Sequence, residues 1–126
     1  MTNKEYTFID LFAGLGGFHL ALQQLGCKCV FASELKEDLR KLYQLNFPEL
    51  DEEYLKGDIT LVDVNDIPSH DILCGGFPCQ PFSQAGKRLG FQDEGRGDLF
   101  FKICEIIHHH RPRYLFLENV SYLRAH

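Results

Sequence analysis

The 126-residue sequence has no apolar run near the roughly 20 residues that a membrane-spanning helix needs, and its start lacks a signal-peptide pattern. These absences argue against a membrane protein and lead us to expect a cytoplasmic location. Paired cysteine motifs at zinc spacing are also missing, because the five cysteines stand at positions 27, 29, 74, 79 and 104. We therefore expect reduced thiols, without a disulfide framework and without a metal site.

A surplus of positive charge is absent as well. The chain carries 13 Lys and Arg against 18 Asp and Glu, for a net charge of −5. DNA-binding domains are usually basic, because neutralisation of phosphates supplies much of their affinity. Charge taken alone therefore argues against a self-sufficient nucleic-acid-binding domain. Length and composition otherwise fit one ordinary globular domain.

Short apolar runs alternate with amphipathic segments along the chain, which predicts a parallel sheet with helices on both faces. In this α/β class, ligands bind beyond the carboxyl ends of the strands. Strands are expected at residues 6–12, 28–34, 71–76 and 113–119, with a weaker signal at 54–56, and helices at about 18–25, 37–46 and from 98 onward.

The helix patterns also predict which side chains face the core. In the first helix, Phe18, Leu22 and Leu25 fall on one face with His19 on the other, and Gly26 stands at a C-cap position. In the last helix Asp98 is expected as the N-cap. Its expected apolar face consists of Phe100, Ile103, Cys104 and Ile107, and the histidines at 108–110 are read as a solvated helix end.

The stretch "DLFAGLGGF" follows the first expected strand and opens the first helix. Its glycines at 14, 16 and 17 let the backbone approach a ligand closely. A dinucleotide-binding fingerprint would place a further glycine at position 19, where this chain has His19. This difference weakens the interpretation of the stretch as an NAD-binding motif. Glu34 follows Gly14 by twenty residues and can accept hydrogen bonds from a ribose. A nucleoside-containing ligand without pyrophosphate fits this combination.

A second group of residues suggests covalent chemistry. Cys79 stands between Pro78 and Pro81 at the end of an apolar run, and a thiolate is a strong nucleophile. The Gly/Pro-rich stretch at 75–97 is longer than an ordinary connection, which indicates a functional loop or lid. Glu118 closes the last strand and is expected beside Cys79, as a proton donor next to a nucleophile.

In order and spacing, "DLFAGLGGF", Glu34, "GDI", "GGFPCQPFS" with "GKRLGF", "RGDLFF" and "ENV" resemble the amino-terminal half of the DNA cytosine-5-methyltransferases. The resemblance covers residues 8–120. It implies a Rossmann-like S-adenosylmethionine-dependent methyltransferase fold, truncated before its last strands and helix. Residues 1–126 would then form a partial cofactor-binding and catalytic domain from which the target recognition region is absent.

The resemblance also implies individual roles. Cys79 would attack carbon 6 of a cytosine flipped out of double-stranded DNA, Glu118 would act at ring nitrogen 3, and Asn119 would help place Glu118. Leu35 stands where the family often has a large aromatic residue. The residues implied to bind S-adenosylmethionine are Phe12, Ala13, Gly14, Leu15, Gly16, Gly17, Glu34, Leu35, Asp58, Ile59, Gly76, Pro78 and Leu99. Those implied for the substrate and lid are Gln80, Ser83, Lys87, Arg88 and Arg96.

The implied function is transfer of a methyl group to carbon 5 of cytosine in DNA, as in bacterial restriction–modification systems. The chain would act as a fragment or subunit that needs a second polypeptide or a missing carboxyl-terminal half. Absence of the parts that bind most DNA phosphates would explain the acidic charge. The alternatives are a non-catalytic S-adenosylmethionine-binding module and a fragment of a tRNA cytosine-5-methyltransferase. Intact Cys79 and Glu118 favour catalysis over the module, and the single proline before Cys79 favours DNA over tRNA.

Overall fold

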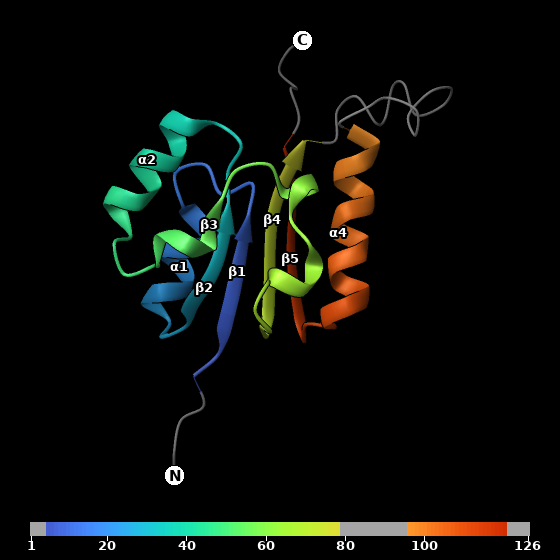
Figure 1. Ribbon diagram of the computed structural model, residues 1–126. Coiled ribbons are helices and arrows are strands. Elements are labelled where there is room, and N and C mark those ends of the chain that lie inside the picture. The colour runs from blue at the N-terminus through green and yellow to red at the C-terminus, as the bar shows by residue number, and fades with distance from the viewer. Residues whose placement is uncertain (1–4, 79–95, 121–126) are drawn as a thin grey trace.

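The computed structural model describes residues 5–78 and 96–120, with the backbone alone at 77–78, 96–98 and 119–120 (Figure 1). Six residues singled out above lie outside these ranges, namely Cys79, Gln80, Pro81, Ser83, Lys87 and Arg88. None of the helices in the described ranges has the length and apolar character that crossing a bilayer requires.

Five parallel strands form one sheet in the order β3-β2-β1-β4-β5. The first strand in the chain is therefore the central one, with β2 on one side and β4 on the other (Figure 1). The strand bounds are Thr7–Leu11 for β1, Lys28–Ser33 for β2, Leu55–Lys56 for β3, Ile72–Pro78 for β4 and Tyr114–Val120 for β5. The predicted parallel sheet is confirmed.

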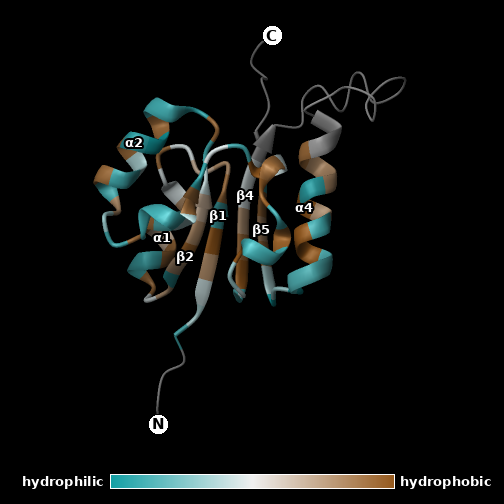
Figure 2. Cartoon of the chain, viewed as in Figure 1, coloured by the Kyte–Doolittle hydropathy of each residue, from teal (hydrophilic) through white to brown (hydrophobic). Residues whose placement is uncertain are grey.

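Both faces of the sheet are covered, as the alternation of elements predicts. Helices α1 (Gly17–Gln24) and α2 (Glu37–Asn46) pack on one face, where Phe8 of β1 lies in their core. Helix α4 (Arg96–His110) and the short turns η2 (Ile59–Leu61) and η3 (Val64–Asp66) cover the other face, against Ile9. Figure 2, which colours the ribbon by residue hydropathy, shows hydrophobic residues along the central strands. A further turn, η1 (Glu52–Tyr54), precedes β3.

The predicted positions of His19 and Leu25 in the first helix are wrong, and so is the predicted N-cap of the last helix. His19 is buried, at 1% exposed, whereas Leu25 is 78% exposed just after the last residue of α1. His19 can be buried because its ring nitrogens meet polar partners from α2 and from the segment after it. Helix α4 begins at Arg96, so Asp98 lies in the first turn and is not the N-cap.

The inward face of α4 also differs from the predicted one. Ile103 and Ile106 are buried, whereas Phe100 is 37% exposed and Cys104 is exposed. The helix therefore turns a face centred on Ile103 and Ile106 toward the sheet. Gly26 does adopt a positive φ of 89° just after α1, as predicted for a glycine that ends a helix.

Strand β5 forms an open apolar edge of the sheet. Four successive side chains are each exposed by 45–47%, from Tyr114 to Leu117. Successive side chains of a strand point to opposite faces, so apolar surface is open on both sides of β5. Among the described residues, β5 pairs with β4 alone.

At the amino-terminal end of β4, His70 is a buried histidine that resists protonation. It is 6% exposed, its Nδ1 lies 2.8 Å from the Pro68 carbonyl oxygen, and its Nε2 has no hydrogen-bond partner among the described residues. The His110 ring lies 5.1 Å from the His70 ring, centroid to centroid. Burial lowers the pKa of His70, the Pro68 carbonyl opposes this, and nearby His110 lowers the pKa further.

This lowered pKa predicts an acid-sensitive component of stability. Below about pH 6.5 the unfolded chain binds a proton at His70 more readily than the folded chain does, so folding weakens as pH falls. Replacing His70→Asn keeps a donor for the Pro68 carbonyl but removes the titration. Between about pH 7 and pH 5, wild type should lose more of its free energy of unfolding than the variant does, as measured by urea unfolding. Parallel losses in both proteins would contradict this account.

Candidate functional site

The loop between β1 and α1 lies at the carboxyl edge of the sheet and has an unusual backbone. Phe12 and Gly14 both have a φ of 57°, and Gly16 has a φ of 92°. Ala13 N donates to the Ser33 carbonyl at 2.9 Å, which ties the loop to the end of β2. A positive φ is costly for a residue such as Phe12, and strained positions of this kind concentrate at binding sites.

Gly16 is required by packing as well as by backbone conformation. An ideal Cβ built on it would lie 2.3 Å from Cε2 of Phe47 and 3.2 Å from Cε2 of Tyr43. Phe47 follows α2 directly and Tyr43 lies within it, so the loop rests on the aromatic side of that helix. No side chain fits in this contact without displacing a ring.

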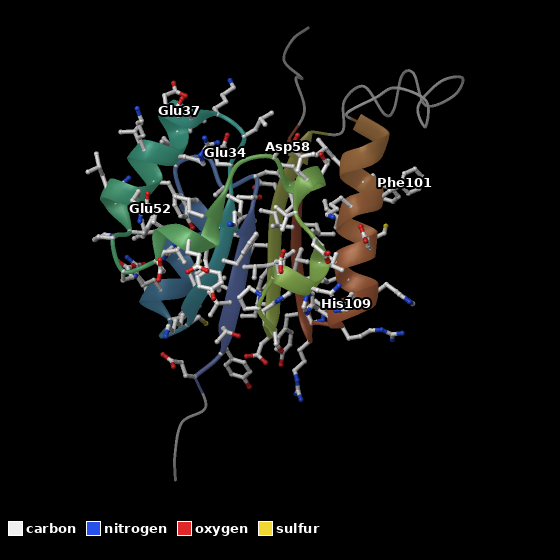
Figure 3. All side chains as sticks on the ribbon, in the orientation of Figure 1. Glu34, Glu37, Glu52, Asp58, Phe101 and His109 are labelled. Atoms are coloured by element: carbon white, nitrogen blue, oxygen red, sulfur yellow. The ribbon has the colours of Figure 1, made fainter. Side chains whose placement is uncertain are left out.

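Glu34 follows β2 and holds the same loop from the other side. Its side chain is 9% exposed, and Oε1 accepts a hydrogen bond from Gly14 N at 2.8 Å. Oε2 accepts from Lys36 N at 3.1 Å, and Arg40 Nη1 donates to the Glu34 carbonyl at 2.8 Å. The carboxylate is thus fixed at the mouth of a cavity, with its oxygens near the loop. Figure 3 shows Glu34 and Asp58 at one edge of the sheet and His109 at the opposite edge.

A first cavity of about 280 Å³ lies beside Glu34. Ile59, Leu35 and Leu99 supply much of its apolar wall. Asp58 accepts hydrogen bonds through Oδ1 from Thr60 N at 2.9 Å and Thr60 Oγ1 at 2.7 Å, which orients its carboxylate at the start of η2. The complete lining is Phe12, Ser33, Glu34, Leu35, Lys36, Gly57, Asp58, Ile59, Gly76 and Leu99. An apolar cleft with two acidic groups suits a nucleoside.

A second cavity of about 370 Å³ also lies against Phe12. Its lining is Phe12, Ala13, Gly17, Phe18, Gly76 and Glu118, so it shares Phe12 and Gly76 with the first cavity. Gly76 of β4 pairs with Glu118 of β5, as expected for neighbouring strands. Pro78 pairs with Val120 at the end of β4, and Cys79 follows outside the described residues. A ligand of nucleoside size and a reacting group could therefore meet at Phe12 and Gly76.

The structure brings ten of the predicted site residues together around these two cavities: Phe12, Ala13, Gly17, Glu34, Leu35, Asp58, Ile59, Gly76, Leu99 and Glu118. Gly14 contributes its N–H to Glu34, whereas Leu15 is 62% exposed and, like Gly16, lines neither cavity. The backbones of Pro78, Arg96 and Asn119 lie in β4, α4 and β5.

Other clusters in the described part of the chain are less informative. A larger hollow of about 540 Å³ lies between α2 and β3, lined by residues such as Arg40 and Glu52, and holds none of the predicted site residues. Groups of three or more side chains suited to a metal ion are absent from the described residues. Burial raises the pKa of Cys29 and of Cys74 to about 12, so these two thiols stay protonated.

Several residues of the site were missed by sequence reasoning. Ser33, Lys36, Gly57 and Phe18 line the cavities and stand next to residues that were predicted. Asp10 was also missed, although an acid inside an otherwise apolar strand is itself a signal. Asp10 is 1% exposed, and the Tyr43 hydroxyl donates to its Oδ2 at 3.2 Å.

The sequence and the fold both match known proteins. A family model described as C-5 cytosine-specific DNA methylase matches residues 6–126. The chain is 54% identical over 125 residues to the Type II methyltransferase M.HpaII of Haemophilus parainfluenzae, covering 98% of this chain and 34% of the relative. It is 49% identical over 126 residues to the Type II methyltransferase M.DsaV of Dactylococcopsis salina, covering 100% of this chain and 34% of the relative.

A solved structure shares the fold. The S. pombe Dnmt2 methyltransferase superposes with a TM-score of 0.67 at 23% sequence identity, over 97% of this chain and 36% of that one. The chain thus spans about a third of the length of the curated relatives described above.

Proposed function

The chain belongs to the family of C-5 cytosine-specific DNA methylases, and from this premise we propose that it forms the cofactor-binding and catalytic part of a bacterial DNA cytosine-5-methyltransferase of the restriction–modification type. The observation that carries the proposal is the pair of cavities that share Phe12 and Gly76. One cavity suits a nucleoside, and the other leads to Glu118 and to the end of the strand that precedes Cys79.

The first cavity fits the adenosine part of S-adenosylmethionine. Glu34 would accept hydrogen bonds from the ribose hydroxyls, with Asp58 near the exocyclic amine of adenine and Ile59 against the ring. Phe12, Ala13, Gly17 and Gly76 would surround the methionine part in the second cavity. The bound cofactor would supply an electrophilic methyl group on its positively charged sulfur.

Cytosine carbon 5 is too weak a nucleophile to take a methyl group directly, so the chain must activate the base. We assign this step to Cys79, whose thiolate adds to carbon 6 while Glu118 donates a hydrogen bond or proton at ring nitrogen 3. Carbon 5 then gains a bond to the methyl carbon as the methyl–sulfur bond breaks. Loss of the proton on carbon 5 restores the double bond and releases the thiolate. The target base must first leave the DNA stack.

We further propose that another polypeptide segment completes this domain. The apolar edge at β5 and the span of about a third of the curated relatives both support a partial domain, residues 1–126, without its target recognition region. A segment that covers β5 would bury the open surface from Tyr114 to Leu117. Gln80, Ser83, Lys87, Arg88 and Arg96 would contact the substrate or close over it, and Asn119 would help place Glu118. A bacterial cytoplasm, where the DNA lies, is the proposed location.

Cofactor binding by the chain tests this function. Wild type should bind S-adenosylmethionine in isothermal titration calorimetry, and Glu34→Gln should weaken binding by about ten- to a hundredfold. The amide keeps the size of the side chain but loses its charge and turns one acceptor into a donor, facing either Gly14 N or Lys36 N.

Glu37→Gln is the matched control, because Glu37 is an exposed carboxylate on α2 that lines neither cavity near Glu34. This control should bind like wild type, and urea unfolding should show that both variants are folded. Absence of binding by wild type, or equal binding by all three proteins, would contradict the assignment of the first cavity.

A further inference from the structure

A series of polar contacts runs beneath the loop between β1 and α1, residues 12–16, called the glycine-rich loop below. The contacts lead from the centre of the sheet to the surface. The Tyr43 hydroxyl oxygen lies 3.2 Å from Asp10 Oδ2 and 2.6 Å from His19 Nδ1. His19 Nε2 lies 3.5 Å from Glu49 Oε2, where the Glu49 side chain is 50% exposed. Asp10, Tyr43 and His19 are each at most 1% exposed. The buried side chains of Tyr43 and His19 thus link β1, α1 and α2 to the buried acid Asp10.

The side chains of His19 and Tyr43 also pack with Phe47 under the glycine-rich loop. His19 stacks on Phe47 with ring centroids 3.7 Å apart, and Tyr43 packs against Phe47 at 5.0 Å. Gly16 lies directly on these rings, because its ideal Cβ would approach both Phe47 and Tyr43 within 3.2 Å. A shift of Tyr43 would therefore move the loop that contributes Phe12 and Ala13, and the start of α1 that contributes Gly17, to the proposed cofactor site.

The contacts allow only certain arrangements of protons, because Tyr43 has a single hydroxyl proton. When Asp10 is ionised, Tyr43 donates to it and His19 donates from Nδ1, so a neutral imidazole turns an unprotonated Nε2 toward the Glu49 carboxylate. When Asp10 is protonated, its carboxyl donates to the hydroxyl oxygen, Tyr43 donates to Nδ1 and Nε2–H points toward Glu49. Only the second arrangement satisfies every contact with an uncharged interior.

The environment favours this second arrangement below about pH 7. Burial raises the pKa of Asp10 to about 7, the Tyr43 hydrogen bond opposes the rise, and the charge of Glu34 adds to it. Burial lowers the pKa of His19, against the opposing effect of Glu49. The titratable groups around Asp10 come from every element packed against it: His19 of α1, Cys29 of β2, Glu34 after β2, Tyr43 of α2, Glu49 after α2 and Cys74 of β4.

We propose that Tyr43 is a positioning residue for the glycine-rich loop, and that the linked side chains of Asp10, Tyr43, His19 and Glu49 hold this loop in its binding conformation when Asp10 is protonated. The inference rests on the proposed function of the loop. Cofactor affinity then depends on the proton of a buried acid that does not touch the cofactor. Ionisation of Asp10 moves the His19 proton from Nε2 to Nδ1. It also weakens the packing of Phe47 and Tyr43 under Gly16.

Calorimetric binding of S-adenosylhomocysteine to wild type, Tyr43→Phe and Tyr54→Phe tests the inference. This probe lacks the sulfonium charge of S-adenosylmethionine, so that charge does not act on Asp10. Wild-type affinity should fall about fivefold between about pH 6 and pH 8, the effect of losing one typical hydrogen bond. Tyr43→Phe keeps the ring under Gly16, and should bind about fivefold more weakly than wild type at about pH 6, with no further fall at pH 8.

Tyr54→Phe is the matched control. Tyr54 is a partly buried tyrosine that packs against the core, and it lines neither cavity of the site. It should keep the wild-type affinity and pH dependence. Nitrogen-15 NMR of His19 gives a second readout: the proton should lie on Nε2 at low pH and move to Nδ1 across pH 7 in wild type, but not in Tyr43→Phe.

The outcomes separate the inference from the function on which it rests. If wild type fails to bind the probe at either pH, the proposed function is overturned. If wild type binds but Tyr43→Phe shows the same affinity and the same pH dependence, the positioning role of Tyr43 is overturned. A His19 tautomer that does not change with pH in wild type overturns the proton linkage.

Discussion

Replacing Gly16→Ala is expected to destabilise the chain by about 3 to 5 kcal/mol, through strain at a positive φ and overlap with a neighbouring ring. Gly16 has a φ of 92°, and the added methyl would lie 2.3 Å from Cε2 of Phe47. Phe47 cannot move freely, because its ring is stacked on buried His19. A loss of this size is a large part of the stability of a single domain. Urea unfolding measures it directly.

Two neighbouring glycines serve as controls for this prediction. Gly14 has a φ of 57° but open space around its ideal Cβ, so Gly14→Ala should cost only about 1 to 2 kcal/mol. Gly17 begins α1 without a positive φ and with nothing within 4 Å, so Gly17→Ala should be neutral or stabilise by up to about 1 kcal/mol. Equal losses at the three positions would contradict the special role of the Phe47 contact.

Methyl transfer should require both Cys79 and a completed domain. The chain alone, incubated with labelled S-adenosylmethionine and mixed-sequence DNA, is expected to transfer no methyl groups. A fusion of this chain to the remaining two thirds or so of M.HpaII, which is 54% identical over the matched region, should transfer them. Cys79→Ser in the fusion should lower the rate at least about a thousandfold, because the nucleophile is lost.

Cys104→Ser is the control for that fusion, since Cys104 is an exposed thiol on α4. It should keep the activity of the parent fusion. Methylation by the 126-residue chain alone would contradict the proposal of a partial domain. Equal activity of the Cys79→Ser and parent fusions would contradict the role of Cys79 as the nucleophile. A parent fusion that binds cofactor but transfers no methyl group would show that the added region does not supply everything that the chain lacks.

Local signals predicted the fold well where one element determines its own structure. The expected helix at 37–46 has the observed bounds, because the acids at its start and the basic residues behind them act within the segment itself. The short β3, at Leu55–Lys56, was only a weak signal, since two residues carry no periodicity and the strand is fixed by pairing with Ala32 and Ser33 of β2.

The polar interior could not be predicted in the same way. His19 was placed on the outer face because hydropathy treats imidazole as polar, whereas its partner Tyr43 lies 24 residues away in another helix. The same limit applies to Asp10, whose burial depends on that tyrosine. Glu34 was found because it ends a strand at the distance from the glycines that a ribose-binding acid needs. Motifs thus located the cavity linings, but not the contacts that support them from below.

The order of the strands has a consequence for how the chain is made. β1 leaves the ribosome first, yet it is the middle strand of the sheet, and Thr7 N donates to Asp71 Oδ2 across a separation of 64 residues. Its second neighbour, β4, exists only after most of the described chain has been synthesised. Parallel pairing at such separations is slow, because a long loop must close before any contact rewards it. A nascent chain that stalls before β4 therefore holds a central apolar strand that can pair on one side only, and it depends on rapid completion, or on a chaperone, to avoid aggregation.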